Sequence, residues 1–290
     1  MQGITLDEVK TFVPTMLGSL RLDALYHGNA LESDARDMLA LVTRYLQASA
    51  KAPVSGFGTV LKLPLHSRIV QEMAIAHDDS GIVVYLQAPD DSLHTRALVN
   101  LLATMMGSPF FDALRTQQQL GYVVNAGTMS VLKVNALALT IESPVADPLE
   151  LEARINAFLG SYAQMLAAMP PEQFAAIKSG FLNDLRQVPD QLDALSSRYW
   201  DDILLEEFNA DSGLKMADAV AGVTQQEVLD YYRAHVADLG ATRVVARSAG
   251  RPHMAGFVAR RKEPLGTVVI QAGHTSYADY KAGKQLYTYP

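Results

Sequence analysis

The residues best suited to chemistry in this sequence are Arg115 and Tyr122, which lie seven positions apart. A guanidinium and a phenol both donate hydrogen bonds, and donors of this kind can stabilise a carbonyl oxygen or an oxyanion. The helical spacing of Phe110, Phe111 and Leu114 predicts an amphipathic helix that is ending at Arg115. The two donors can act together only if the chain turns between them and holds their side chains next to each other.

The segment between the two residues predicts such a corner. Gly121 is expected to supply the left-handed residue that often ends a helix. Tyr122, Val123 and Val124 then begin a run typical of a strand. A structural interpretation stays open beside the functional one, because a cation at a helix C-terminus also stabilises the helix dipole.

The elements that must position this corner follow from periodicity and capping signals. Capping boxes are expected at Thr5 with Glu8 and at Thr224 with Glu227, and Asp147 precedes a first-turn proline. The predicted helices cover 5–17, 31–47, 91–106, 108–119, 147–162, 170–186, 190–207, 213–221 and 225–235. The predicted strands cover 20–26, 58–63, 67–76, 80–88, 122–130, 134–142 and, as the last, 242–249. Grouped strands separated by runs of helices predict an α+β fold, with an antiparallel-rich mixed sheet covered by helices on one face.

The domain organisation is predicted from one weakly structured stretch. Residues 48–57 are small and include proline and glycine, so the linker is placed at 51–57. The preceding segment 1–50 has one strand and no partner for it, which suggests the end of a domain that begins elsewhere. Residues 58–265 are expected to form a complete domain, followed by a C-terminal tail at 266–290. From residue 250 onward only turns and short extended pieces are expected.

Composition excludes several classes of function. The chain has 290 residues, 49% hydrophobic and 19% charged, which is typical of a soluble globular protein. Its formal net charge is −7 without a clustered basic face, so no nucleic acid partner is expected. There is no run of 18 apolar residues, so no membrane span is expected. The absence of cysteine excludes thiolate metal sites and leaves a periplasmic or a cytoplasmic compartment equally open.

Signatures of independent catalysis are missing from the sequence. Zinc hydrolysis on a helix needs two histidines one turn apart with a carboxylate, but the closest two of the seven histidines are His66 and His77, eleven residues apart. His77 and the two aspartates after it are interpreted as a turn. No serine elbow or phosphate loop is present. The acidic cluster at helical spacing is interpreted as a solvated face; it comprises Asp201, Asp202, Glu206 and Glu207. No metal ligand or cofactor is therefore expected in this chain.

The corner also carries a resemblance to a known family. The stretch Leu114–Tyr122, Leu-Arg-Thr-Gln-Gln-Gln-Leu-Gly-Tyr, resembles the Leu-Arg-Thr-x-x-Gln-Leu-Gly-Tyr hallmark in the C-terminal half of the insulysin/pitrilysin zinc metallopeptidases. Looser similarities are found at 25–29, 80–87, 197–200 and 286–287. Gln117 and Gln118 depart from the usual Lys-Glu of the family, a change expected to affect docking electrostatics more than the donor pair.

The resemblance implies a fold and a role. Residues 1–50 would be the last part of a penultimate peptidase-like domain, and 58–265 the last domain of the repeat. The zinc motif His-x-x-Glu-His would lie in an N-terminal half that closes with this one around a peptide substrate. Tyr122 would then donate to the scissile carbonyl oxygen, while Arg115 would hold the substrate backbone or orient the tyrosine.

Three functions stay open at this point. The chain could be the non-catalytic C-terminal part of an insulysin-like endopeptidase, a stand-alone inactive subunit that pairs with a separate zinc subunit, or a pseudo-enzyme that binds peptides. In each case the chain is expected to be inactive alone. Its partners would be a zinc-containing half or subunit and a peptide, and exposed apolar surface is expected to favour self-association.

Overall fold

The computed structural model of the chain describes residues 3–17, 22–46, 58–205, 210–271 and 277–289. The chain divides into two compact units, and each is described by itself. The first takes its residues from 1–59, 188–212 and 288–290, and the second comprises Val60–Gln187 and Gly213–Tyr287. The expected linker at 51–57 lies outside the described residues, so its position stays a prediction.

Three helices make up most of the first unit: α1 (Leu6–Leu17), α2 (Glu32–Leu46) and α6 (Leu192–Leu204). The predicted capping box begins α1, because Thr5 Oγ1 accepts from Glu8 N at 3.3 Å and Glu8 Oε2 accepts from Thr5 N at 2.8 Å. Neither α1 nor α2 contains a buried residue. Most of their large apolar side chains are exposed in the described part of the chain.

The strand expected at 20–26 is wrong for its described part. Residues 22–27 adopt no helix or strand, and 18–21 lie outside the described residues. His27 instead contacts α6, with Nδ1 2.8 Å from Ser196 Oγ and its ring edge-on to Tyr199. A strand needs a neighbouring backbone to satisfy its polar groups, and the described residues of this unit offer none to 22–27.

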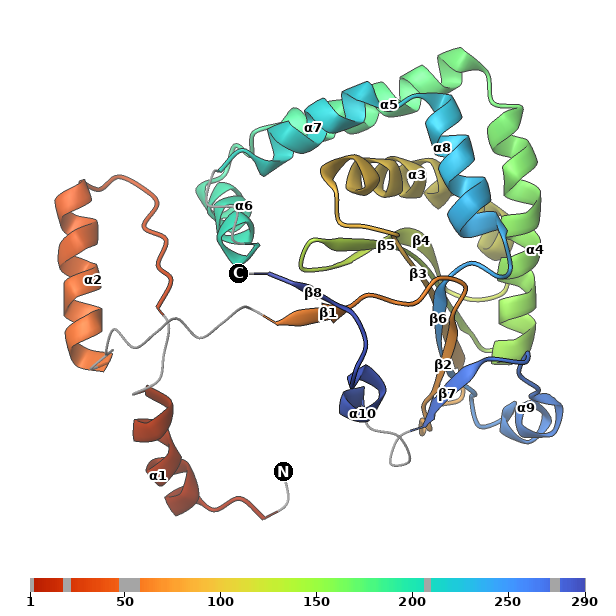
Figure 1. Cartoon of the computed structure of the whole chain (residues 1–290), viewed down its shortest axis with the longest axis horizontal. Helices are drawn as coiled ribbons and strands as arrows, with labels where there is room; N and C mark the ends of the chain where they lie inside the picture. The colour runs from red at the N-terminus through yellow and green to blue at the C-terminus, as the bar shows by residue number, and fades with distance from the viewer. Residues whose placement is uncertain (1–2, 18–21, 47–57, 206–209, 272–276, 290) are drawn as a thin grey trace. The chain divides into compact units, whose positions relative to one another are not determined.

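The strands of the described residues belong mainly to the second unit (Figure 1). They are β1 (Thr59–Leu61), β2 (Arg68–Glu72), β3 (Ser80–Gln87), β4 (Val123–Val131), β5 (Val134–Ser143), β6 (Arg243–Ser248), β7 (Val268–Gln271) and β8 (Leu286–Thr288). Six form one sheet in the order β4-β5-β3-β6-β2-β7, and β1 pairs with β8. The first four strands of that order pair antiparallel, whereas β2 runs parallel to both β6 and β7. This confirms the α+β class and the antiparallel-rich mixed sheet.

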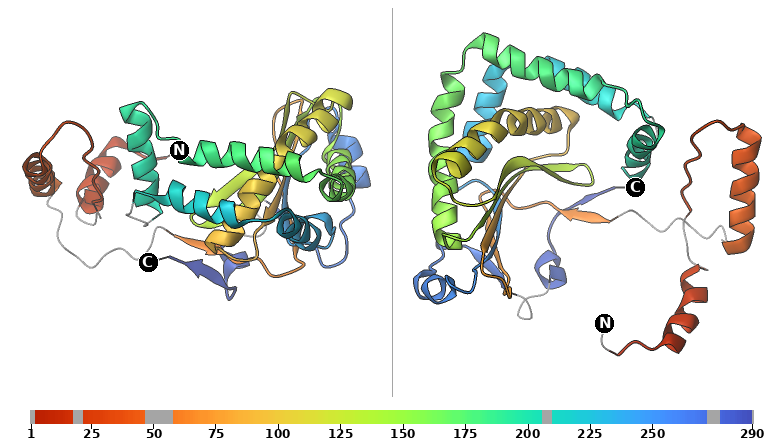
Figure 2. Two further views of the ribbon diagram at one scale, coloured as in Figure 1. Left: turned by 90° about the horizontal axis from the view of Figure 1, so that it is seen from above. Right: turned by 180° about the vertical axis from the view of Figure 1, so that it is seen from behind.

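Helices cover one face of the large sheet, as expected. They are α3 (Leu93–Phe111), α4 (Pro148–Ala167), α5 (Pro171–Arg186), α7 (Ser212–Gly222) and α8 (Gln225–Tyr232). Figures 1 and 2 show the other four arranged around α3. Every second residue of β3 is buried against them (Ile82, Val84 and Leu86), because side chains alternate along a strand. The smaller apolar cluster around Leu63, Ile69 and Ile270 is separate from this core.

The central helix α3 differs from prediction in two respects. The two helices expected at 91–106 and 108–119 are one continuous helix through Gly107 and Pro109, followed by the π-helix η1 (Asp112–Gln117). Glycine and proline are poor helix formers, but the burial of ten α3 residues outweighs their presence here. The helical stretch Leu93–Gln117 is also long and apolar enough to cross a membrane by length and composition alone. However, 56% of the 18-residue part of this stretch that meets the criterion is buried inside the fold, as in a core helix.

Two predictions for the C-terminal third are wrong. The segment after 249 contains a further strand of the large sheet, β7, besides the short helices α9 (Met254–Arg260) and α10 (Tyr277–Lys281). The acidic cluster is not uniformly solvated, because Asp202 is only 3% exposed while Asp201 is exposed. Adjacent helical residues point about 100° apart, so the two aspartates lie on different faces of α6.

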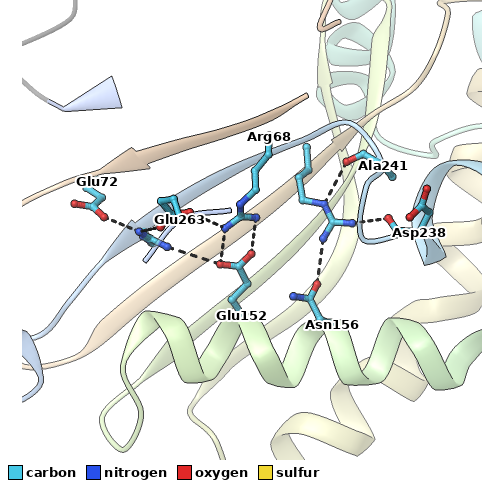
Figure 3. Close-up of polar contacts among 9 residues, drawn as sticks. Arg68, Glu72, Glu152, Asn156, Asp238, Ala241 and Glu263 are labelled. Atoms are coloured by element: carbon cyan, nitrogen blue, oxygen red, sulfur yellow. Dashed lines mark hydrogen bonds and ion pairs between the residues drawn. The ribbon is translucent and has the colours of Figure 1, made fainter. Parts of the chain in front are cut away.

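A cluster of buried ion pairs ties α4 to the parallel part of the sheet (Figure 3). Arg68 donates to both carboxylate oxygens of Glu152 at 2.6 and 3.0 Å, and it lies 3.3 Å from Glu263. Arg247, only 1% exposed, donates to Glu72 at 2.6 Å and also to Glu263. Burial acts to lower the pKa of Arg68, but the bonds and charge of Glu152 and Glu263 outweigh it and raise the pKa. Because each cation has a carboxylate partner, the cluster is a structural link.

Candidate functional site

The candidate site lies where the chain passes from α3 to β4, and the π-helix η1 carries Arg115 into it. The N–H of Gln118 bonds the carbonyl of Ala113, five residues back, which is the wider π spacing. Leu114 is fully buried and fixes this turn to the core. Arg115 therefore leaves the helix from an anchored turn.

Gly121 has a different role from the one predicted. The left-handed residue of the corner is Gln119, with φ 53°. Gly121 is needed for space, because a Cβ at this position would lie 1.8 Å from the carbonyl oxygen of Glu142 on β5. The corner is therefore pressed directly against the backbone of the sheet, and a side chain at 121 would push Tyr122 away.

Arg115 and Tyr122 lie side by side, as the sequence predicts. Arg115 Cζ is 4.7 Å from the centroid of the Tyr122 ring and 5.2 Å from that of Phe111. Arg115 Nη1 also donates to the Tyr122 carbonyl oxygen at 2.6 Å. One guanidinium thus contacts both the ring and the backbone of the tyrosine, which restricts how the phenol can move.

The exposure of the pair makes it accessible to a ligand. Tyr122 is 83% exposed and Arg115 is half-buried, although its neighbour Leu114 belongs to the core. A phenol in this position can donate to an oxygen brought to it from outside the chain. The geometry supports a donor site for a carbonyl or an anion.

The described residues do not fit a zinc site. No three side chains among the histidines, aspartates and glutamates of the described ranges are grouped to hold a metal ion. Several histidines have protein partners instead: His253 Nε2 lies 3.1 Å from the Pro144 carbonyl oxygen, and His77 Nδ1 accepts from Asp79 N at 3.1 Å. The latter bond confirms the predicted turn at 77–79. His274 lies outside the described residues.

Comparison with known proteins begins with a family model. PQQ synthase PqqF-like, C-terminal lobe domain 4, matches residues 101–200, which include Arg115 and Tyr122. Among curated proteins, the chain is 26% identical over 239 residues to human insulin-degrading enzyme, covering 80% of this chain and 23% of that protein. It is 28% identical over 250 residues to the Saccharomyces cerevisiae A-factor-processing enzyme, covering 84% and 24%. It is 26% identical over 250 residues to protease 3 of Salmonella typhi, covering 86% and 26%. The chain thus spans about a quarter of the length of these relatives.

Solved structures show the same fold. Pitrilysin superposes with a TM-score of 0.78 at 22% identity, over 90% of this chain and 27% of that one. A peptidase M16 inactive domain from Pseudomonas fluorescens superposes with a TM-score of 0.57 at 13% identity, over 86% and 58%. Sequence and fold together make this chain similar to the C-terminal part of the insulysin/pitrilysin family.

Proposed function

We propose that this chain is the non-catalytic C-terminal portion of an insulysin-like zinc metalloendopeptidase. It closes the substrate chamber and presents Arg115 and Tyr122 to the scissile peptide. The observation that carries the proposal is the exposed phenol of Tyr122, held by a guanidinium at a corner anchored in the core. A donor fixed in advance toward developing negative charge lowers the barrier to peptide hydrolysis.

Each residue of the pair has its own task in this proposal. Tyr122 donates a hydrogen bond from its hydroxyl to the carbonyl oxygen that becomes an oxyanion. Arg115 is a positioning residue, because its Nη1 is already engaged by the Tyr122 backbone. Zinc, which polarises the carbonyl in this family, is held by a part of the enzyme or a subunit other than this chain.

Exposed apolar residues on the first unit support a partner of this kind. The two helices without buried residues carry a row of large apolar side chains in contact with solvent; they include Leu6, Phe12, Met16, Met38 and Tyr45. Such surface is expected to pack against the zinc-bearing portion, and in its absence to promote self-association.

The test is the substitution Tyr122→Phe in a complete, zinc-loaded enzyme. Loss of one fixed donor is expected to lower kcat by about 10²–10³-fold with zinc content unchanged. Tyr26→Phe, at a tyrosine 52% exposed and outside α1 and α2, is the matched control and should leave turnover unchanged. Equal turnover for wild-type and Tyr122→Phe enzymes would refute the role.

A second function is favoured by one comparison. The similar fold from Pseudomonas fluorescens is described as a peptidase M16 inactive domain. A stand-alone inactive subunit would restore turnover when mixed with a separate zinc subunit. A peptide-binding pseudo-enzyme would bind peptides with no partner that hydrolyses them.

A further inference from the structure

The strand β4 ends the large sheet on one side and leaves its outer edge open. It is the terminal strand in the order β4-β5-β3-β6-β2-β7, and no described strand pairs with its other edge. An open edge carries a row of backbone N–H and C=O groups without sheet partners. An extended peptide is the ligand whose backbone can satisfy such a row.

A groove runs along this edge between β4 and α3. Two hollows of about 570 and 360 Å³ share the lining residues Gly107 and Ser108 of α3. On the strand side they are lined by residues 124–128. Thr104 and Ser108 are both exposed and stand one helical turn apart on the helix wall. The groove therefore follows the strand for about half its length.

We propose that the β4 edge binds an extended peptide segment as an added strand, with every second side chain of the peptide entering the groove against α3. The proposal rests on the proposed function for the identity of its occupant as a peptide. The open edge and the groove beside it support the mode of binding on their own.

The groove is continuous with the Arg115–Tyr122 pair. Phe111 lines the smaller hollow. The Arg115 guanidinium lies over the same Phe111 ring, with Cζ 5.2 Å from the ring centroid. Val124 and Asn125, which line it from the strand, follow Tyr122 almost directly. A peptide paired with β4 would therefore have one end beside the phenol.

The charge of the groove selects among peptides. Asp112 is the one charged side chain among the described residues that line the two hollows, and it is exposed. A lysine or arginine of the peptide can pair with this carboxylate, whereas an acidic residue is repelled by it. A peptide with a basic residue is therefore preferred over the same peptide with a glutamate.

The register of the hairpin identifies a backbone group to block. The two-residue turn at 132–133 joins β4 to β5, with Val131 opposite Val134. Such a turn is closed by a hydrogen-bonded pair, and alternate residues then direct their N–H groups to the other side. Thr128 is on the outward set, so Thr128→Pro removes a group that a peptide needs and leaves the β4–β5 ladder intact.

The experiment measures binding of two fluorescein-labelled peptides to the whole chain by anisotropy. Both peptides alternate threonine and valine over about eight residues, the length of an ordinary strand, and carry either lysine or glutamate at the centre. We expect the lysine peptide to bind and to slow hydrogen exchange at the β4 amides. Ser108→Trp, which fills the groove, and Thr128→Pro should each weaken binding by about tenfold or more. Asp112→Asn should lower the affinity for the lysine peptide by about two- to fivefold.

Matched variants separate the site from general damage. Ser161→Trp places the same side chain on an exposed position of α4, away from the groove, and should bind like the wild type. Thr128→Ala keeps the backbone N–H, so it should weaken binding much less than Thr128→Pro. Absence of binding by both peptides, or binding without protection of β4, would overturn the proposal. Protection that grows with protein concentration in the absence of peptide would also overturn it, since two copies would then pair edge to edge.

The result is independent of the catalytic role of Tyr122. Peptide binding by the lone chain, compared across Ser108→Trp and Thr128→Pro, tests the β4 edge, whereas turnover of the complete enzyme with Tyr122→Phe tests the donor role. If no peptide binds along β4 of the lone chain but Tyr122→Phe still lowers turnover, only the β4 proposal is refuted. If peptide binds along β4 but Tyr122→Phe leaves turnover unchanged, only the proposed oxyanion role is refuted.

Discussion

The guanidinium of Arg115 lies over the ring of Tyr122 and also donates to the carbonyl oxygen of the same residue. The two contacts engage two parts of one tyrosine, its aromatic ring and its backbone. The phenol thus projects from the surface with its direction set by a residue that is itself anchored through Leu114.

Removal of this contact should loosen the corner. Arg115→Ala is expected to lower the free energy of unfolding by about 0.5–1 kcal/mol, the magnitude of an exposed cation–π contact. Urea denaturation measures the loss, and NMR line widths of the Tyr122 ring report its mobility. Arg115→Lys keeps the charge without the planar fork, so an intermediate result is expected. Tyr122 line widths that are equal in all three proteins would contradict the positioning role.

Gly121→Ala should be strongly destabilising, because its Cβ would lie 1.8 Å from the Glu142 carbonyl oxygen. Backbone must move to relieve this overlap, at a cost of about 1–3 kcal/mol or more. Gly160→Ala is the matched control: this glycine lies inside α4 with nothing within 4 Å of the added atom. It should raise stability by about 0.5–1 kcal/mol. Thermal unfolding of both variants tests the contrast, and similar shifts in Tm would be inconsistent with it.

The buried ion pairs predict a large loss for Arg247→Met. Glu72 and Glu263 would each lose a partner in a buried setting, at a cost of about 3–5 kcal/mol. Arg154→Met breaks an exposed pair with Glu150 on α4 and should cost at most about 0.5 kcal/mol. Chemical denaturation of the two variants under the same conditions measures the difference. A small loss for Arg247→Met would mean that Arg68 and Arg261 compensate.

The capping box of α8 predicts a pH dependence. Thr224 Oγ1 accepts from Glu227 N at 3.2 Å, and hydrogen bonds from the Thr224 side chain and backbone lower the pKa of Glu227. Since this pKa is below its ordinary value of 4.5, the stabilisation is complete above that value and is lost as the pH falls through the lowered one. Thr224→Ala should cost about 1 kcal/mol at neutral pH. The difference from wild type should shrink in acid, as stability curves at several pH values would reveal.

Local signals in the sequence predicted local structure well. Both capping boxes are present, and so is the start of α4 at Asp147, because these depend on residues within one turn of each other. The Arg115–Tyr122 contact was also predictable, since seven residues and a helix end fix its geometry. The hallmark stretch then indicated the family.

Long-range contacts explain what the sequence did not reveal. Gly121 suited a left-handed stop by residue type, but the contact that requires it is with Glu142, twenty-one residues later in the chain. The join of β7 to β2 was missed because parallel pairing leaves no turn signal between the partners. The groove beside β4 was missed for a similar reason, since strand order alone decides which edge stays open.

The π-helix Asp112–Gln117 makes the donor pair sensitive to the number of residues in the chain. A π turn holds one residue more than an α turn. Deletion of a single residue between Asp112 and Arg115 would let ordinary α pitch continue and would change the direction in which the guanidinium leaves the helix. The loss or gain of a single codon would therefore change how the arginine and the phenol are aligned, although both side chains would still be encoded.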